Sequence, residues 1–221
     1  MDIDSVRGKH AHDALIQLFE QQRIDILVGT QMVVKGLDFE HVALVGILDA
    51  DAILGFADFR VNERGFQLME QVSGRSGRKG EQGKVLIQVR NTAHPVLQYV
   101  QQHDYKAFAT VELFSRQQFG YPPYTRLIQL RFRHKLPETV AAAARQLADW
   151  LKPSFGNYMV GPAAPVVNRV RNQYIMELLI KLPKDLHLLQ QCKDQIQILI
   201  AHLHQQPPFK SVVVTPDIDP I

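Results

Sequence analysis

A sharp break near the middle of the chain constrains its fold more than any other sequence feature. Residues 120–124 read Gly-Tyr-Pro-Pro-Tyr, and proline cannot continue a helix. The pattern of apolar residues differs on the two sides of this break. We therefore expect two domains, residues 1–118 and residues 119–221, with the two helices before the break connecting them.

The first of these domains alternates between helical and strand-like segments. The predicted elements are a helix at 9–22, buried strands at 24–28 and 42–48, a loop at 52–61, a helix at 62–76, a strand at 84–89 and helices at 95–102 and 104–118. In the helix at 62–76, Phe66, Met69 and Val72 fall on the inner side, and Asn62 is the candidate N-cap. Alternating helices and strands indicate an α/β fold with a parallel sheet.

The second domain follows a different order. Its predicted elements are a strand at 126–133, a helix at 137–151, paired strands at 158–170 and 172–182, a helix at 186–204 and a strand at 209–214. The stretch Arg171-Asn172-Gln173 is the candidate hairpin tip between the paired strands. The string β-α-β-β-α-β is typical of a smaller ferredoxin-like α+β domain.

Composition excludes several classes of protein. The chain has 221 residues, a formal net charge of +3 and one cysteine, Cys192, so it forms no intrachain disulfide and no cysteine-built zinc site. It has no apolar run of about 18 residues and no signal-peptide pattern at its start. We expect a soluble protein of a reducing compartment, hence the cytoplasm.

Two arginines follow glycines at the end of the helix predicted at 62–76. Residues 71–78 read QVSGRSGR, which places Arg75 and Arg78 three apart, so that on a helix they point the same way. A guanidinium group offers a planar fork of donors that suits a phosphate, and such a pair fits the arginine-finger arrangement of phosphoryl transfer. The alternative is a solvated basic helix end followed by a glycine turn.

A second polar motif follows the apolar run at 24–28. Residues 29–39 read GTQMVVKGLDF, which places small polar groups after a predicted strand. In α/β sheets, ligands bind at the carboxyl ends of the strands.

The order of these motifs resembles motifs V and VI in the second RecA-like lobe of superfamily 2 helicases. The successive segments GTQMVVKGLDF, LDAD and QVSGRSGR are similar to those of the primosomal protein N′ family of replication-restart helicases. The similarity continues to the C-terminus. This resemblance implies the C-terminal part of an ATP-dependent DNA helicase, a hydrolase that unwinds 3′ to 5′. It implies a partial RecA-like parallel sheet, incomplete at its N-terminus, followed by a ferredoxin-like domain. In the complete protein it implies recognition of stalled or repaired replication forks and restart of replication by primosome assembly.

The resemblance also implies roles for residues near the nucleotide. Arg75 and Arg78 would approach the phosphates, with Arg78 at the γ-phosphate, and Gln71 would link the nucleotide state to the lobe interface. Gly36 would place its backbone near the nucleotide, and Asp38 would meet the ribose or a water molecule. A helix or turn cap is the alternative role for Asp38.

A further set of residues is implied to contact DNA. Gly29, Thr30 and Gln31 match the part of motif V that touches nucleic-acid phosphates, and Lys35 is a candidate to add charge. Contacts of this kind position the backbone without reading its sequence. Asp49 and Asp51 are interpreted as structural or interface residues, with catalysis or metal binding as the alternative. Two basic clusters, at Arg131 to Lys135 and at Arg169 with Arg171, are candidates for DNA or for an acidic protein tail, with a solvated surface as the alternative.

Several motifs of the family do not occur in these 221 residues. The sequence has no GxxxxGK[ST] phosphate loop and no acidic DExx box, which the family carries in its first lobe. We therefore expect ATP and Mg²⁺ to be shared with that missing lobe, zinc to belong to the full-length protein and not to this chain, and the isolated chain not to hydrolyse ATP. The implied partners are forked and single-stranded DNA, single-stranded-DNA-binding protein and primosomal loading proteins. The alternative function is a DNA- and protein-binding scaffold module without catalysis of its own.

Overall fold

The computed structural model describes residues 11–29, 42–73 and 84–220. Contacts between Cα atoms divide the chain into two compact units, residues 1–110 and residues 111–221. Each unit has its own hydrophobic core. The first is the N-terminal unit and the second is the C-terminal unit.

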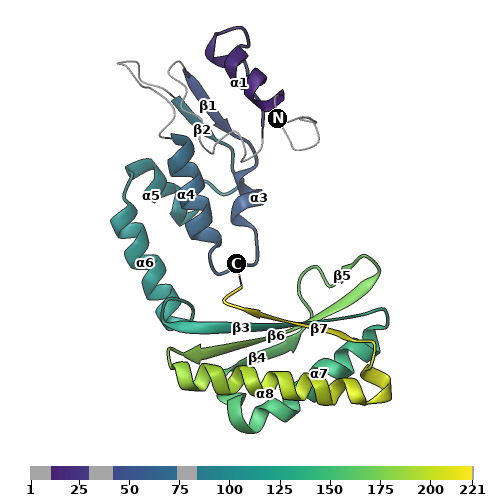
Figure 1. Ribbon diagram of the computed structural model, residues 1–221. Coiled ribbons are helices and arrows are strands. Elements are labelled where there is room, and N and C mark those ends of the chain that lie inside the picture. Colours follow the sequence, from purple (N-terminus) through teal and green to yellow (C-terminus); the bar gives the residue numbers. More distant parts are fainter. Residues whose placement is uncertain (1–10, 30–41, 74–83, 221) are drawn as a thin grey trace. The chain divides into compact units, whose positions relative to one another are not determined.

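The N-terminal unit combines helices with a small parallel sheet (Figure 1). Its described elements are α1 (Ala11–Glu20), β1 (Leu44–Ile47), α3 (Ala50–Leu54), α4 (Val61–Ser73), β2 (Lys84–Ile87), α5 (Pro95–Gln102) and the first part of α6 (Tyr105–Gln118). Strands β1 and β2 pair in parallel, in a register that runs from Leu44 opposite Lys84 to Ile47 opposite Ile87. The predicted α/β alternation and parallel pairing are confirmed for these elements.

Helix α4 is held in this unit by one apolar face. Phe66, Met69 and Val72 lie three residues apart and are buried, as predicted from their spacing. The ring of Phe66 stacks on the ring of Phe108 from α6, with centroids 4.4 Å apart and planes 4° apart. Aromatic pairs of this kind contribute about 0.5–1.5 kcal/mol beyond the area that they bury.

Four expectations for this unit are wrong. The buried strand expected at 42–48 is the shorter β1, in which Ile47 is buried but Leu44 is 54% exposed. Residues 24–28 do not form a buried strand, since no strand is assigned there and the side chains of Ile26 and Val28 are 77% and 69% exposed. A short apolar run forms a strand only where neighbouring backbone completes its ladder, and composition does not reveal that neighbour. The loop expected at 52–61 begins inside helix α3, which ends where the Gly55 N–H donates to the Asp51 carbonyl. Asn62 is not the N-cap of α4, because that helix already begins at Val61.

The C-terminal unit is an antiparallel sheet with two long helices on one face (Figure 1). Its elements are β3 (Thr125–His134), α7 (Pro137–Phe155), β4 (Met159–Ala163), β5 (Arg169–Val170), β6 (Gln173–Pro183), α8 (Leu186–Gln205) and β7 (Val213–Ile218), with short 3₁₀ helices η1 (Gly156–Tyr158) and η2 (Pro207–Phe209). The strand order is β4-β6-β3-β7, and β5 pairs with β6. All of these pairs are antiparallel, so the molecule is a mixed α/β protein with a small parallel sheet and a larger antiparallel one.

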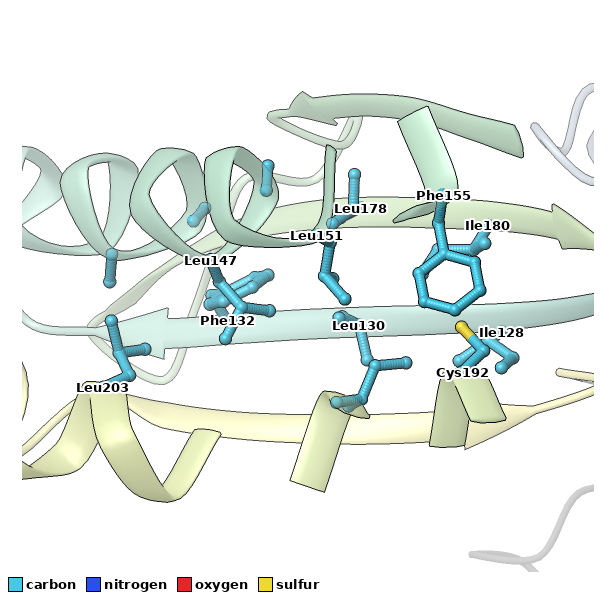
Figure 2. Packing of buried hydrophobic residues seen from close by; sticks show 14 of the residues in the cluster. Ile128, Leu130, Phe132, Leu147, Leu151, Phe155, Leu178, Ile180, Cys192 and Leu203 are labelled. Atoms are coloured by element: carbon cyan, nitrogen blue, oxygen red, sulfur yellow. The ribbon is translucent and has the colours of Figure 1, made fainter. Parts of the chain in front are cut away.

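The core of the C-terminal unit lies between the sheet and its helices (Figure 2). Alternate residues of the central strand β3, namely Ile128, Leu130 and Phe132, are fully buried on this side. Figure 2 shows Leu147 and Leu151 of α7 directed toward these strand residues.

The predicted order of elements is found, with two corrections. The single strand expected at 158–170 is divided into β4 and β5, because residues 164–168 have no strand structure. The last strand runs from Val213 to Ile218 rather than from 209 to 214, because Pro207 and Pro208 open a 3₁₀ helix that delays it. The hairpin tip falls at Arg171 and Asn172, which have φ angles of 47° and 62°. Two residues with positive φ form the two-residue turn that matches the twist of paired strands.

Candidate nucleotide and nucleic-acid site

Most of the expected site residues lie outside the part of the chain that the structure describes. These are Thr30, Gln31, Lys35, Gly36, Asp38, Arg75 and Arg78. The two that are described are Gly29, exposed in an irregular segment, and Gln71, near the end of α4. Helix α4, which leads into the QVSGRSGR motif, is described as far as Ser73.

Helix α4 directs its polar side toward solvent at Gln71. Because Phe66, Met69 and Val72 occupy the buried face, Gln67 and Gln71 lie on the opposite side of the helix. On that side the Gln67 amide donates to the Glu63 carboxylate at 3.2 Å, and Gln71 is exposed. The apolar spacing of α4 thus sets the orientation of the helix that leads into the QVSGRSGR motif.

A polar contact ties this helix to α5 one residue before Gln71. Nδ1 of His103 lies 3.0 and 3.1 Å from the two carboxylate oxygens of Glu70. His103 is the C-cap of α5 and has a φ of 51°. Sequence reasoning missed this pair, since the two residues are far apart in the chain and neither belongs to a motif.

The turn before α4 is organised by Asp58. Its carboxylate accepts a hydrogen bond from the Arg60 backbone N–H at 2.9 Å and forms an ion pair with Arg64 at 3.0 Å. An aspartate that bonds its own backbone two residues on is typical of such turns. Asp58 thus stabilises the turn that precedes α4, whereas the sequence had suggested Asn62 as the residue that caps the start of this helix.

The Leu-Asp-Ala-Asp stretch links the ends of the two parallel strands. The Asp51 carboxylate accepts a hydrogen bond from the Arg90 backbone N–H at 2.7 Å, and the Ala50 N–H donates to the Gln88 carbonyl at 3.0 Å. Asp49 has a φ of 57°, a conformation that aspartate tolerates better than most residues. Asp51 therefore has a structural role, and the contact across 39 residues could not be read from local pattern.

The arginines of the C-terminal unit differ in whether a carboxylate neutralises them. Arg131 pairs with Glu177 at 2.9 Å, and Arg126 pairs with Asp219 at 2.7 Å. Within the described part of the chain, Nε of Arg133 is buried without a hydrogen-bond partner. Arg169 instead lies over the ring of Tyr174, 5.0 Å from its centroid.

The prolines of the break are flanked by a tyrosine that packs against the sheet. Nζ of Lys181, on β6, lies 3.6 Å from the centroid of the Tyr121 ring and donates to the Phe119 carbonyl at 2.8 Å. The Thr125 hydroxyl donates to the Gly120 carbonyl at 2.9 Å. These contacts fix the connection between α6 and β3 on the C-terminal unit.

The single cysteine is chemically quiet. Cys192 is fully buried, and burial raises the pKa of its thiol from 9.0 to about 11. Within residues 11–29, 42–73 and 84–220, no three His, Cys, Asp or Glu side chains are grouped so as to hold a metal ion. In the same ranges no helix is long and apolar enough to cross a membrane.

Comparison with known families assigns each half of the chain. Residues 2–80 match the helicase conserved C-terminal domain, and residues 117–221 match the primosomal protein N C-terminal domain. The first match spans both the GTQMVVKGLDF and the QVSGRSGR motifs.

Curated relatives match the whole chain. The replication restart protein PriA of Synechocystis sp. is 39% identical over 100% of this chain and 26% of its own length. PriA of Bacillus subtilis is 36% identical over 100% of the chain and 27% of its own length. PriA of Treponema pallidum is 38% identical over 100% of the chain and 33% of its own length. The chain thus spans between about a quarter and a third of these relatives, and it belongs to the replication restart protein PriA family.

Proposed function

We propose that this chain is the C-terminal part of an ATP-dependent DNA helicase that restarts replication at stalled or repaired forks. The observation that carries the proposal is the tandem match, in which a helicase C-terminal domain is followed by a primosomal protein N C-terminal domain. In the complete protein, motifs V and VI would couple ATP hydrolysis to movement along DNA, 3′ to 5′, and lead to primosome assembly. The cytoplasm is the proposed location.

The proposed domains are a second RecA-like lobe with its connecting helices, residues 1–118, and a ferredoxin-like domain, residues 119–221. The parallel pair β1–β2 supports the first assignment, and the match that begins at residue 117 supports the boundary. The order β3-α7-β4-β6-α8-β7, with β3 and β6 central in the sheet, supports the second.

The proposed nucleotide contacts are Arg75, Arg78 and Gln71, together with the backbone of Gly36 and the carboxylate of Asp38. Two guanidinium groups and one amide supply donors that fit the oxygens of a triphosphate, and Gln71 is exposed on the solvent side of α4. ATP would bind with Mg²⁺ and with residues of the first lobe, and zinc would belong to the full-length protein outside this chain. The role of this chain is to place positive charge beside the phosphate that is transferred.

The proposed DNA contacts in the lobe are Gly29, Thr30, Gln31 and Lys35. Hydroxyl, amide and backbone N–H groups bind phosphates without reading sequence, and a motor needs such contacts at every nucleotide. Single-stranded-DNA-binding protein and primosomal loading proteins are the proposed protein partners, alongside forked and single-stranded DNA.

The test is Arg78→Ala in the complete protein. We expect DNA-stimulated ATP hydrolysis to fall about 10³-fold or more, while the Kd for forked DNA changes little. The control is Arg90→Ala, which also removes one exposed guanidinium and keeps the backbone N–H that binds Asp51. Loss of DNA binding with intact hydrolysis would reverse the assignment of the motif. Robust DNA-stimulated hydrolysis by the isolated 221-residue chain would contradict the proposal that half of the nucleotide site lies elsewhere.

The second candidate function is a scaffold module that binds DNA and proteins without catalysis of its own. The separate core of the C-terminal unit favours this reading, since such a unit can fold around its own apolar side chains. The two readings differ in the slope of log K against log salt concentration for forked DNA, which counts phosphate contacts. Nearly equal binding by residues 1–118 and by the whole chain would count against the scaffold.

A further inference from the structure

One hairpin of the C-terminal unit exposes both apolar and basic side chains. This tip hairpin, residues 164–174, contains β5 and the start of β6 and extends from the sheet on the side away from α7 and α8 (Figure 1). Val166, Val167 and Val170 are 88%, 64% and 47% exposed. These aliphatic side chains do not pack in the core of their own unit, and exposed apolar groups of this kind mark interaction sites.

The charge of the tip hairpin is not neutralised by its surroundings. The sequence contains no aspartate or glutamate between Asp149 and Glu177. Among the described residues, neither Arg169 nor Arg171 forms an ion pair with a carboxylate, whereas Arg131 on the same sheet does. Of the two basic clusters seen in the sequence, the tip hairpin therefore retains more of its positive charge.

Arg169 is also held in place before any partner binds. Its guanidinium lies over the Tyr174 ring at 5.0 Å and donates to the side-chain oxygen of Asn172. Because Arg171 and Asn172 form the two-residue turn, the backbone of the tip has a defined conformation. A donor that is already ordered loses less entropy when it binds.

Resting on the proposed function, we propose that the tip hairpin is a nucleic-acid contact of this chain. Arg169 and Arg171 bind phosphates of the DNA backbone, and the exposed valines lie against bases or sugars beside them. Guanidinium groups complement phosphate charge, and proteins that distort DNA insert aliphatic side chains at base steps. Forked DNA offers both phosphates and unpaired bases, which is the combination that this surface complements.

The test compares two double variants of the 221-residue chain that lose the same charge. Arg169→Ala with Arg171→Ala removes the guanidinium groups of the tip. Arg145→Ala with Lys152→Ala removes two exposed cations from α7. Among the described residues, the Arg145 side chain bonds only the Ala141 carbonyl of its own helix. Affinity for a forked DNA is measured by fluorescence anisotropy across a series of salt concentrations.

We expect the tip variant to bind at least ~10-fold more weakly and to lower the slope of log K against log salt by about 1.8, since each phosphate contact contributes about 0.9. The α7 variant should keep both quantities close to those of the parent chain. Equal losses in the two variants, an unchanged slope, or no binding of forked DNA by the parent chain would overturn the proposal. The proposal would also be overturned if the tip variant bound forked DNA as tightly as the parent chain and lost affinity only for an aspartate-rich peptide. None of these outcomes bears on Arg78 and ATP hydrolysis, so failure here is distinct from failure of the proposed function.

A second measurement reports contact at the tip directly. Val167→Cys introduces one accessible thiol, because the native Cys192 is buried and its pKa is raised to about 11. A fluorophore attached at residue 167 should change its emission when forked DNA binds, and a fluorophore at Lys152→Cys on α7 should not. Identical responses at the two positions would contradict contact at the tip.

Discussion

The two units of the chain bury their sheets to different extents. In the C-terminal unit, the long central strands β3 and β6 are each paired on both sides, and the side chains that they turn toward α7 and α8 are almost wholly buried. In the described part of the N-terminal unit, β1 and β2 form a two-stranded parallel sheet. There Val45 and Ile87 pack on the core, while Leu44 and Leu86 are 54% and 62% exposed.

This difference teaches where each unit derives its stability. Antiparallel sheets are stable with one covered face, whereas parallel sheets are normally covered on both, and a two-stranded sheet is marginal by itself. Within its described residues, the N-terminal unit therefore depends more on helix packing, which includes the Phe66–Phe108 stack. The C-terminal unit depends on a continuous sheet and its helices.

The largest expected effect tests whether the two cores unfold separately. Phe132→Ala should lower the free energy of unfolding of the C-terminal unit by about 3–5 kcal/mol, because Phe132 is fully buried. The single tryptophan of the chain, Trp150, packs against this core, so its fluorescence in urea follows this unit. Phe66→Ala is the matched change in the other core and should leave the midpoint of the Trp150 signal in place. If both variants shift that midpoint equally, the units unfold as one, and Phe132→Leu provides a milder version should Phe132→Ala fail to fold.

The next effect depends on pH and should occur only in the C-terminal unit. Burial raises the pKa of Cys192 from 9.0 to about 11, so the folded thiol keeps its proton at a pH where the unfolded thiol has lost it. The resulting stability is fully present below pH 9 and is lost as the pH rises toward 11, a change on the order of 2–3 kcal/mol. Urea unfolding followed by Trp150 between pH 7 and pH 11 measures it, against Cys192→Ala as the control. Parallel curves for the parent and the variant would show that the thiol does not contribute.

A smaller effect is expected where Asp51 joins the ends of the parallel strands. Asp51→Ala removes the acceptor of the Arg90 N–H and should lower the stability of the N-terminal unit by about 1–3 kcal/mol. The Arg90 amide should exchange its hydrogen faster, as measured by NMR. Asp51→Asn keeps one acceptor oxygen and should give an intermediate rate. An Arg90 amide that exchanges at the parent rate in Asp51→Ala would mean that this bond does not hold the strand ends together.

The smallest effect concerns the second face of the parallel sheet. Leu86→Thr should change the free energy of unfolding by less than about 0.5 kcal/mol, since the side chain is exposed. Ile87→Thr, on the face that packs against the core, should cost about 1–3 kcal/mol. Circular dichroism of urea unfolding compares the two. Equal costs would indicate that both faces are covered, and the contrast between the two units would disappear.

Helices and their buried faces could be predicted from the sequence, because their apolar spacing is a local signal. The spacing of Phe66, Met69 and Val72 placed the inner side of α4 correctly, and α5 was predicted with the bounds that the structure has. The strand expected at residues 24–28 is absent for the opposite reason, since a strand needs a neighbouring strand whose position in the sequence no local pattern gives. The later start of β7 has a local cause, the two prolines of η2. The prediction gave more weight to the apolar residues from 209 onward than to these prolines.

For the site, the sequence supplied motifs and the structure supplied the contacts around them. The resemblance to the family rested on the residues of the motifs and not on the spacing of apolar residues. Asp51 and Arg90, or Glu70 and His103, come together only through the fold, and no local pattern marks them. The roles of Arg75 and Arg78 stay predictions, since these residues lie outside the described ranges.

Helix α6 has a practical consequence for dissecting this protein. It extends from Tyr105 to Gln118 and so passes through the division between residues 110 and 111. A truncation at that division would cut the helix in its middle and leave two frayed ends, which would make either half look unstable for reasons unrelated to its own core. A cut in the glycine–proline loop after Gln118 leaves the helix whole, and stabilities measured on the separated pieces are meaningful only with that choice.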